Sequence, residues 1–199
     1  MKKSLLLLVP FALWLMSFGP VANVNQHTYN VTLDGKPIGT YNVHRTDIGE
    51  SSTYRVETTT AAGLIRPIEH TFVMMSSYNN SKLISSDLKT WVNQELESSS
   101  VLQWDGSQYI QQQGEKLTEI CCEAVDFSSA TIFFNEPVNR TTLFYEKYGM
   151  DLKVEKVADH TYEVEIPNGG VERYTYKKGE VIEVQFVQSF ATITLRKQG

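Results

Sequence analysis

The residues that could carry chemistry are scattered along this chain of 199 residues. Its four histidines, His27, His44, His70 and His160, lie far apart, and no two have the spacing of metal ligands on one strand face. No Gly-x-Ser-x-Gly sequence is present, so the exposed serine nucleophile of the α/β-hydrolases has no counterpart. The sequence therefore offers no catalytic, metal-binding or cofactor-binding motif, and we expect no cofactor.

Paired carboxylates are the remaining catalytic candidates. Glu95 and Glu97 share one face of an expected strand, and such a pair could serve a hydrolase. The carboxylates of a glycosidase must face each other across a cleft, which local spacing does not establish, and an exposed acidic strand face explains the same residues. We expect a non-enzymatic protein, with a carboxylate-dependent hydrolase as the last of three hypotheses.

Three further residues could line a binding pocket. Glu136 follows an apolar run in Asn135-Glu136-Pro137, where a proline-ended turn after a buried strand is the alternative explanation. Tyr174 and Tyr176 fall on one face of an expected strand. On a curved sheet they could line a concave site for an apolar or amphipathic ligand, or they could be core residues, because strands are enriched in tyrosine anyway.

The two cysteines, Cys121 and Cys122, are adjacent. An ordinary disulfide holds its Cα atoms further apart than the roughly 3.8 Å between neighbouring residues. A vicinal disulfide would therefore be strained and easily reduced. The alternatives are two free thiols, one buried and one at a strand edge, or an intermolecular bridge or metal contact. Two thiols without nearby histidine or cysteine partners do not predict a zinc site.

The first 22 residues predict a secretory signal peptide. Lys2 and Lys3 precede the apolar run 5–15, and small or polar residues follow. An uncleaved membrane anchor is the alternative, but a spanning helix needs ~20 apolar residues and this run is interrupted sooner. Cleavage lowers the net charge from −5 to −7, because two lysines and no acidic residue are lost. This charge argues against nucleic acid as a partner, and no later apolar stretch is long enough for a transmembrane helix.

The rest of the chain, 23–199, is dominated by an alternation of apolar and polar residues, which is typical of β-strands. Asp34-Gly35 and Asp105-Gly106 each separate two such runs, which is a strong hairpin signal. The expected strands are 28–33, 38–44, 52–60, 68–78, 82–97, 101–104, 108–113, 152–157, 161–166, 171–177, 181–188 and 190–195.

The connections between these runs are too short for helical crossovers. We therefore expect an all-β single domain, a long antiparallel meander of roughly ten to twelve strands. A long meander must protect its edges, and this favours a sheet curled into a barrel or half-barrel. The stretch 117–149 alternates least clearly, and a short helix could lie at 125–130 or at 142–148.

Several segments resemble an uncharacterised family of exported bacterial proteins, catalogued as a domain of unknown function. They are YNVTLDGKPIGTY, WDGSQY, IFFNEP, FYEKYG and YTYKKGEVIEV, and the similarity covers essentially the whole chain after the signal. The resemblance implies a bacterial cell envelope, periplasmic or secreted setting. It implies no activity and transfers no catalytic residues, and the adjacent cysteines are not part of the family pattern.

The sequence leaves two main hypotheses for function. The first is an exported envelope protein that binds a lipid-like molecule, or another envelope component, on a concave sheet. The second is a structural or interaction module with a filled core. They differ in whether the concave face is open or filled.

Overall fold

The computed structural model describes residues 21–63, 67–120, 123–167, 169–188 and 191–199. In this part of the chain there is no helix, and fourteen strands form one sheet. The strands are β1 (Asn23–Leu33), β2 (Lys36–Ile48), β3 (Ser51–Ala62), β4 (Ile68–Asn79), β5 (Lys82–Val92), β6 (Glu95–Trp104), β7 (Tyr109–Gln113), β8 (Lys116–Ile120), β9 (Thr142–Tyr145), β10 (Met150–Ala158), β11 (Thr161–Glu165), β12 (Val171–Lys177), β13 (Glu180–Gln188) and β14 (Ala191–Lys197).

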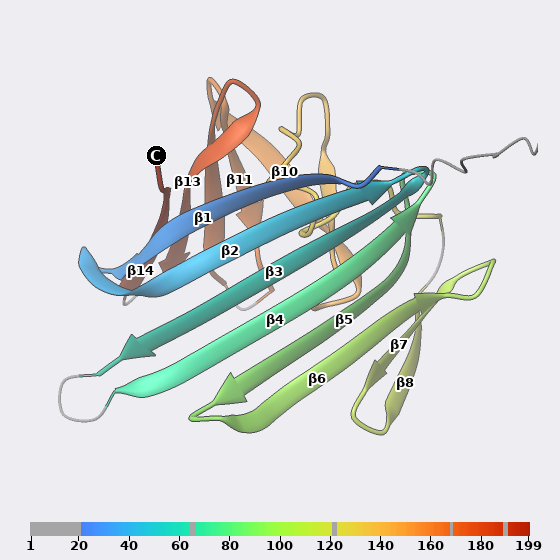
Figure 1. Ribbon diagram of the computed structural model, residues 1–199, viewed down its shortest axis with the longest axis horizontal. Coiled ribbons are helices and arrows are strands. Elements are labelled where there is room, and N and C mark those ends of the chain that lie inside the picture. The colour runs from blue at the N-terminus through green and yellow to red at the C-terminus, as the bar shows by residue number, and fades with distance from the viewer. Residues whose placement is uncertain (1–20, 64–66, 121–122, 168, 189–190) are drawn as a thin grey trace, which may run out of the picture.

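The all-β antiparallel meander predicted from the sequence is confirmed. The order in the sheet is β8-β7-β6-β5-β4-β3-β2-β1-β14-β13-β12-β11-β10-β9, so each strand lies beside its neighbour in the chain and β1 joins β14. Val31 of β1 faces Leu195 of β14 in this central ladder. Figure 1 shows the broad sheet β1–β6 crossing in front of the strands β10–β14. The two arms of the sheet curl toward each other without closing a ladder between β8 and β9.

Tight turns set the registers of this meander. The Asp34-Gly35 turn has φ of 47° and 81°, and Asn93-Gln94 has φ of 49° and 69°. Two residues with positive φ are the mark of a type I′ hairpin, whose twist matches that of the strands. The Asn93-Gln94 turn divides the run 82–97, which the sequence predicted as one strand, into β5 and β6.

Two strands were not predicted, and the two suggested helices are wrong. Apart from Ile120, the residues of β8 are exposed on both faces of the strand. Their sequence therefore lacks the alternation of buried and exposed positions that predicts a strand. Strand β9 is four residues long and occupies 142–145, where a helix was suggested. The segment 125–130 is irregular: Ser128 forms a single β-bridge with Phe144, and a turn follows at 129–130.

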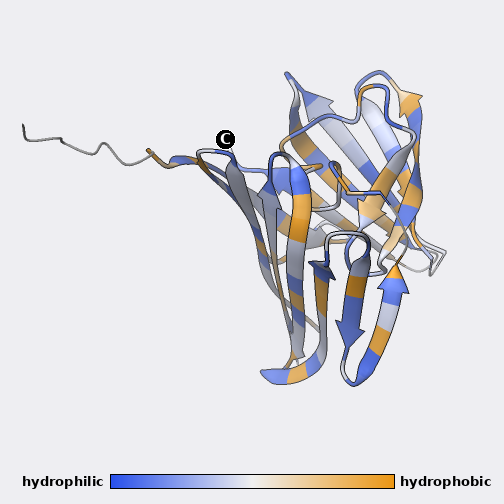
Figure 2. Ribbon diagram, turned by 90° about the vertical axis from the view of Figure 1, so that its right-hand side faces the viewer, coloured by the Kyte–Doolittle hydropathy of each residue, from blue (hydrophilic) through white to orange (hydrophobic). Residues whose placement is uncertain are grey.

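One face of the sheet forms the core. Hydrophobic and hydrophilic residues alternate along the strands in Figure 2, as the period of two in the sequence requires. The inward residues include Tyr29, Val43 and Val184, which are fully buried.

A segment between β8 and β9 fills one half of the concave side. We call residues 126–136 the plug. Phe133 of the plug packs against Tyr29 and Tyr41 at ring-centroid distances of 5.7 and 5.3 Å. Phe134 packs against Tyr54 at 5.7 Å. The interior of the curled sheet is therefore filled at this end by the chain itself.

Side chains hold the two arms together where no ladder does. Gln111 donates from Nε2 to the carbonyl of Glu146 at 3.1 Å, and Gln113 donates to the carbonyl of Lys147 at 3.2 Å. The turn between β9 and β10 thus docks on β7. Gly149 in this turn has φ +62° and lies directly against Ile120.

Two sequence predictions concern residues that fall wholly or mainly outside the described part of the chain. The signal peptide at 1–22 is described only from Val21 onward, and β1 begins at Asn23. Cys121 and Cys122, proposed as a vicinal disulfide, are not described. In the described residues, no helix is long and apolar enough to cross a membrane.

Candidate functional site

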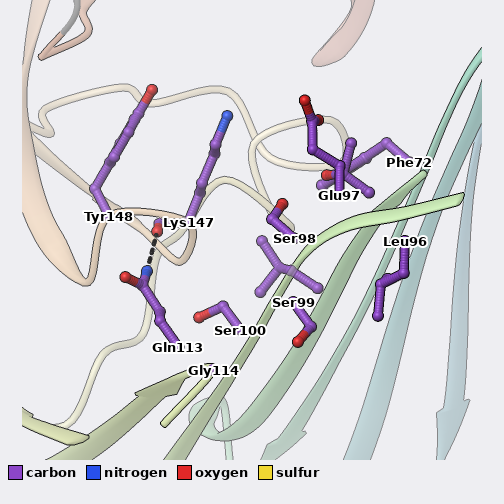
Figure 3. A pocket seen from close by; sticks show the side chains of 12 residues that line it. Phe72, Leu96, Glu97, Ser98, Ser99, Ser100, Gln113, Gly114, Lys147 and Tyr148 are labelled. Carbon is purple, nitrogen blue, oxygen red and sulfur yellow. Dashed lines mark hydrogen bonds between the residues drawn. The ribbon is translucent and has the colours of Figure 1, made fainter. Parts of the chain in front are cut away.

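A groove lies beside the filled half of the concave side. Its volume is about 570 Å³, within the range of small-molecule pockets. Strands β4, β5 and β6 form one side, and the β9–β10 turn with Lys147 and Tyr148 forms the other (Figure 3). The groove therefore lies where the two arms of the sheet approach each other.

The strand registers explain the floor of the groove. Phe72 pairs with Thr90, and Thr90 pairs with Ser98, so one row of cross-strand neighbours runs through the groove. In the next row Leu88 pairs with Ser100. Directly opposed residues on adjacent strands share a face. The result is an apolar floor that carries hydroxyl groups at one edge.

The groove wall opposite the sheet is a four-residue turn. The amides of Tyr148 and Gly149 both donate to the carbonyl of Tyr145, at 3.0 and 2.9 Å. Gln113 fixes the carbonyl of Lys147 in the same turn, as the dashed line in Figure 3 shows. The ammonium of Lys147 lies 5.6 Å from the centroid of the Tyr148 ring, a cation–π distance.

A buried carboxylate lies behind this turn. Glu172 is 2% exposed and accepts hydrogen bonds from the hydroxyls of Tyr145 at 2.7 Å and Tyr174 at 2.6 Å. Burial raises the pKa of Glu172, and the two tyrosine hydroxyls and the nearby charge of Lys147 act in the opposite direction.

A second buried carboxylate anchors the plug. Glu146 accepts from the hydroxyls of Ser128 and Ser129 and from the backbone amides of Ser129 and Ala130. Burial raises the pKa of Glu146, and these donors oppose that shift. The hydroxyl of Tyr78 on β4 joins the network through Ser128. Because Glu146 directly precedes Lys147, the same residue ties the plug to the wall of the groove.

The residues predicted to line a pocket lie away from this groove. Glu136 lines a separate cavity of about 310 Å³ and accepts from Tyr162 and from His160, each at 2.9 Å. Burial and this hydrogen bond raise the pKa of Tyr162 to about 12. Tyr174 and Tyr176 are buried in the core and line neither cavity.

The other candidate residues from the sequence analysis do not come together at one site. Glu97 lies at the edge of the groove, whereas Glu95 does not line it. His27 is buried against the ring of Phe134, with its Nε2 unpartnered among the described atoms. Burial, with the charge of Lys197, lowers the pKa of His27. The described residues contain no cluster of histidine, cysteine and acidic residues able to hold a metal ion.

Sequence reasoning missed the two buried glutamates. Glu172 stands two residues before Tyr174 and four before Tyr176, so the strand period places it on the same inward face, and that signal was available. Glu146 had no such signal, since its partners come from a plug whose position only the tertiary structure sets.

Comparison with known proteins identifies the family. Residues 29–198 match the model of DUF6134, a domain of unknown function. The chain belongs to this family. The resemblance to an uncharacterised family that the sequence segments indicated is thereby confirmed.

The fold also occurs in a solved structure. A crystal structure of a β-barrel-like protein of the domain of unknown function DUF1849, from Brucella abortus, aligns with a TM-score of 0.55 at 11% sequence identity. The alignment covers 87% of this chain and 95% of that one. The likeness shows a shared β-barrel-like fold across essentially the whole domain. A comparison with curated proteins gives no match.

Proposed function

We propose that this protein binds an amphipathic small molecule in the groove, with the apolar part of the ligand on Phe72 and Tyr148. The observation that carries the proposal is an open concave surface with an apolar floor in a molecule whose other half is filled. Phe72 and Tyr148 are only partly buried, so apolar area remains for a ligand to cover.

The apolar floor supplies part of the free energy of binding. Each methylene removed from water contributes ~0.8 kcal/mol. A ligand with about eight buried methylenes therefore gains roughly 6 kcal/mol from the floor, before the cost of association is subtracted. Micromolar binding requires about 8 kcal/mol, so the floor alone does not reach it and polar contacts at the rim must supply the remainder.

The cellular setting belongs to the same proposal. We infer that the chain is exported to the periplasm or the cell exterior, because its first 22 residues have the three parts of a secretory signal. Mass spectrometry of the protein recovered from a bacterial envelope fraction tests this inference. An intact mass that retains residues 1–22, or recovery from the cytoplasm alone, contradicts it.

Binding is tested with a fluorescent amphiphile such as a dansyl-labelled undecanoate. Ser98→Trp places a large ring in the groove, and we expect the affinity to fall by about tenfold, which is ~1.4 kcal/mol. Gln103→Trp is the matched control, because Gln103 is an exposed residue of the same strand outside the groove. Equal affinity of both variants and the unmodified protein would refute binding at this site.

The plug supports a second candidate, an interaction module with a filled core. Its packing occupies half of the concave side without any ligand. If no amphiphile binds and native mass spectrometry of envelope-derived protein shows no bound small molecule, this second function is the one to pursue.

A further inference from the structure

The groove carries two opposite charges on its two walls. Lys147 stands on the β9–β10 turn and Glu97 on β6, and both line the groove. In the described part of the chain neither side chain takes part in an ion pair, unlike Lys89, which pairs with Asp87. Figure 3 shows the two side chains rising from opposite sides, with Ser98 between them.

Two contacts fix the position of Lys147. Its carbonyl is held by Gln113, and its ammonium lies over the ring of Tyr148. A lysine constrained in this way loses less side-chain entropy on binding a ligand than a free one. Pairing between β6 and β7 begins at Ser100, and Glu97 lies in the part of β6 before it. The side chain of Glu97 is exposed to solvent.

The buried Glu172 does not compete for a ligand cation. It is 2% exposed, and both of its oxygens accept tyrosine hydroxyls. The charges that a ligand meets first are therefore those of Lys147 and Glu97.

From this arrangement we propose that the ligand has a zwitterionic head group, an anionic group that binds Lys147 beside a cationic group that binds Glu97. This inference rests on the proposed function, because it names the head of the amphiphile whose chain occupies the apolar floor. A purely anionic head would meet one attractive and one repulsive charge, and a purely cationic head would do the same in reverse. A head with both charges, such as a phosphocholine or phosphoethanolamine, satisfies both walls.

Amphiphiles with one chain and different heads test the inference. Dodecylphosphocholine, dodecyl sulfate, dodecyltrimethylammonium and dodecyl maltoside are titrated below their micellar concentrations, in competition with the fluorescent probe. Each exposed charge contact contributes up to about fivefold in affinity. We expect the phosphocholine to bind about tenfold more tightly than the sulfate and the trimethylammonium, with a preference that weakens at high salt.

Variants assign each half of the head. Lys147→Gln should weaken binding of phosphocholine and sulfate about threefold and strengthen binding of trimethylammonium, because a repelling charge is removed. Glu97→Gln should weaken binding of phosphocholine and trimethylammonium and strengthen binding of sulfate for the same reason. The exchange of the two charges, Glu97→Lys with Lys147→Glu, should retain the preference for phosphocholine. Lys82→Gln and Glu50→Gln remove exposed charges remote from the groove and serve as controls.

The outcomes separate the two proposals. If none of the dodecyl compounds binds, the proposed function is wrong and the head-group inference is wrong with it. If all four bind with equal affinity, or if sulfate or trimethylammonium binds most tightly, the groove still holds an apolar chain and only the head-group inference is overturned.

Discussion

The Glu146 network gives the most direct test of how the plug is held. Glu146→Gln keeps the size of the side chain but replaces one carboxylate oxygen by an amide NH₂. The oxygens of Glu146 accept from the amides of Ser129 and Ala130 and from two serine hydroxyls. Whichever way the amide is oriented, its NH₂ faces a backbone N–H, that of Ala130 or that of Ser129. These two amides keep a second acceptor, the Ser128 hydroxyl and the Phe144 carbonyl respectively, so the variant loses hydrogen bonds to a charged acceptor without leaving a backbone donor unpaired.

The magnitude follows from these partners. A hydrogen bond to a charged group contributes ~1.5–3 kcal/mol, about twice as much as one between neutral groups. We expect Glu146→Gln to lower the free energy of unfolding by about 1–3 kcal/mol at neutral pH, which moves the midpoint of urea unfolding by about 0.5–1.5 M.

Equilibrium urea unfolding, followed by tryptophan fluorescence, measures the change. Glu97→Gln is the control, because an exposed substitution should alter stability by no more than about 0.5 kcal/mol. Unchanged or increased stability of Glu146→Gln would show that the carboxylate does not hold the plug, and the reasoning would be wrong.

Three further outcomes are expected. The pKa of Glu146 is raised in the folded protein, so its contribution to stability is greatest below its ordinary pKa of 4.5 and declines as pH rises through the folded value. The free energy of unfolding, measured across pH, should not show this decline in Glu146→Gln. Gly149→Ala should lower stability by ~1–3 kcal/mol, since φ is +62° and the new methyl would collide with Gln111, and thermal unfolding should show it. Tyr176→Phe leaves the carbonyl of Ile132 without its 2.8 Å donor, and calorimetry should show a loss of ~1–2 kcal/mol.

The fold could be predicted from local sequence because its connections are local. The Asp34-Gly35 hairpin and the alternation of 171–177 specify neighbouring strands through rules that act over a few residues. The plug could not be predicted in the same way. Glu146 accepts hydrogen bonds from the backbone of the plug, and it follows the plug at some distance in the chain. The alternation of residues along a strand does not predict such a contact.

The candidate site shows the same division. Phe72 and Leu88 were placed on strands, and their shared face follows from the strand period. Lys147 lies opposite these strands because Gln111 and Gln113 of β7 bind the β9–β10 turn. Tyr174 and Tyr176 were considered for a pocket, and the plug buries them instead.

By itself the sequence determined the β class, the antiparallel meander and the family, because alternation and turn chemistry are local properties of the chain. Only the tertiary structure decided which half of the concave side is filled and which is open. That choice depends on where one long connection packs, and the buried carboxylate of Glu146, which follows this connection in the chain, holds it in place.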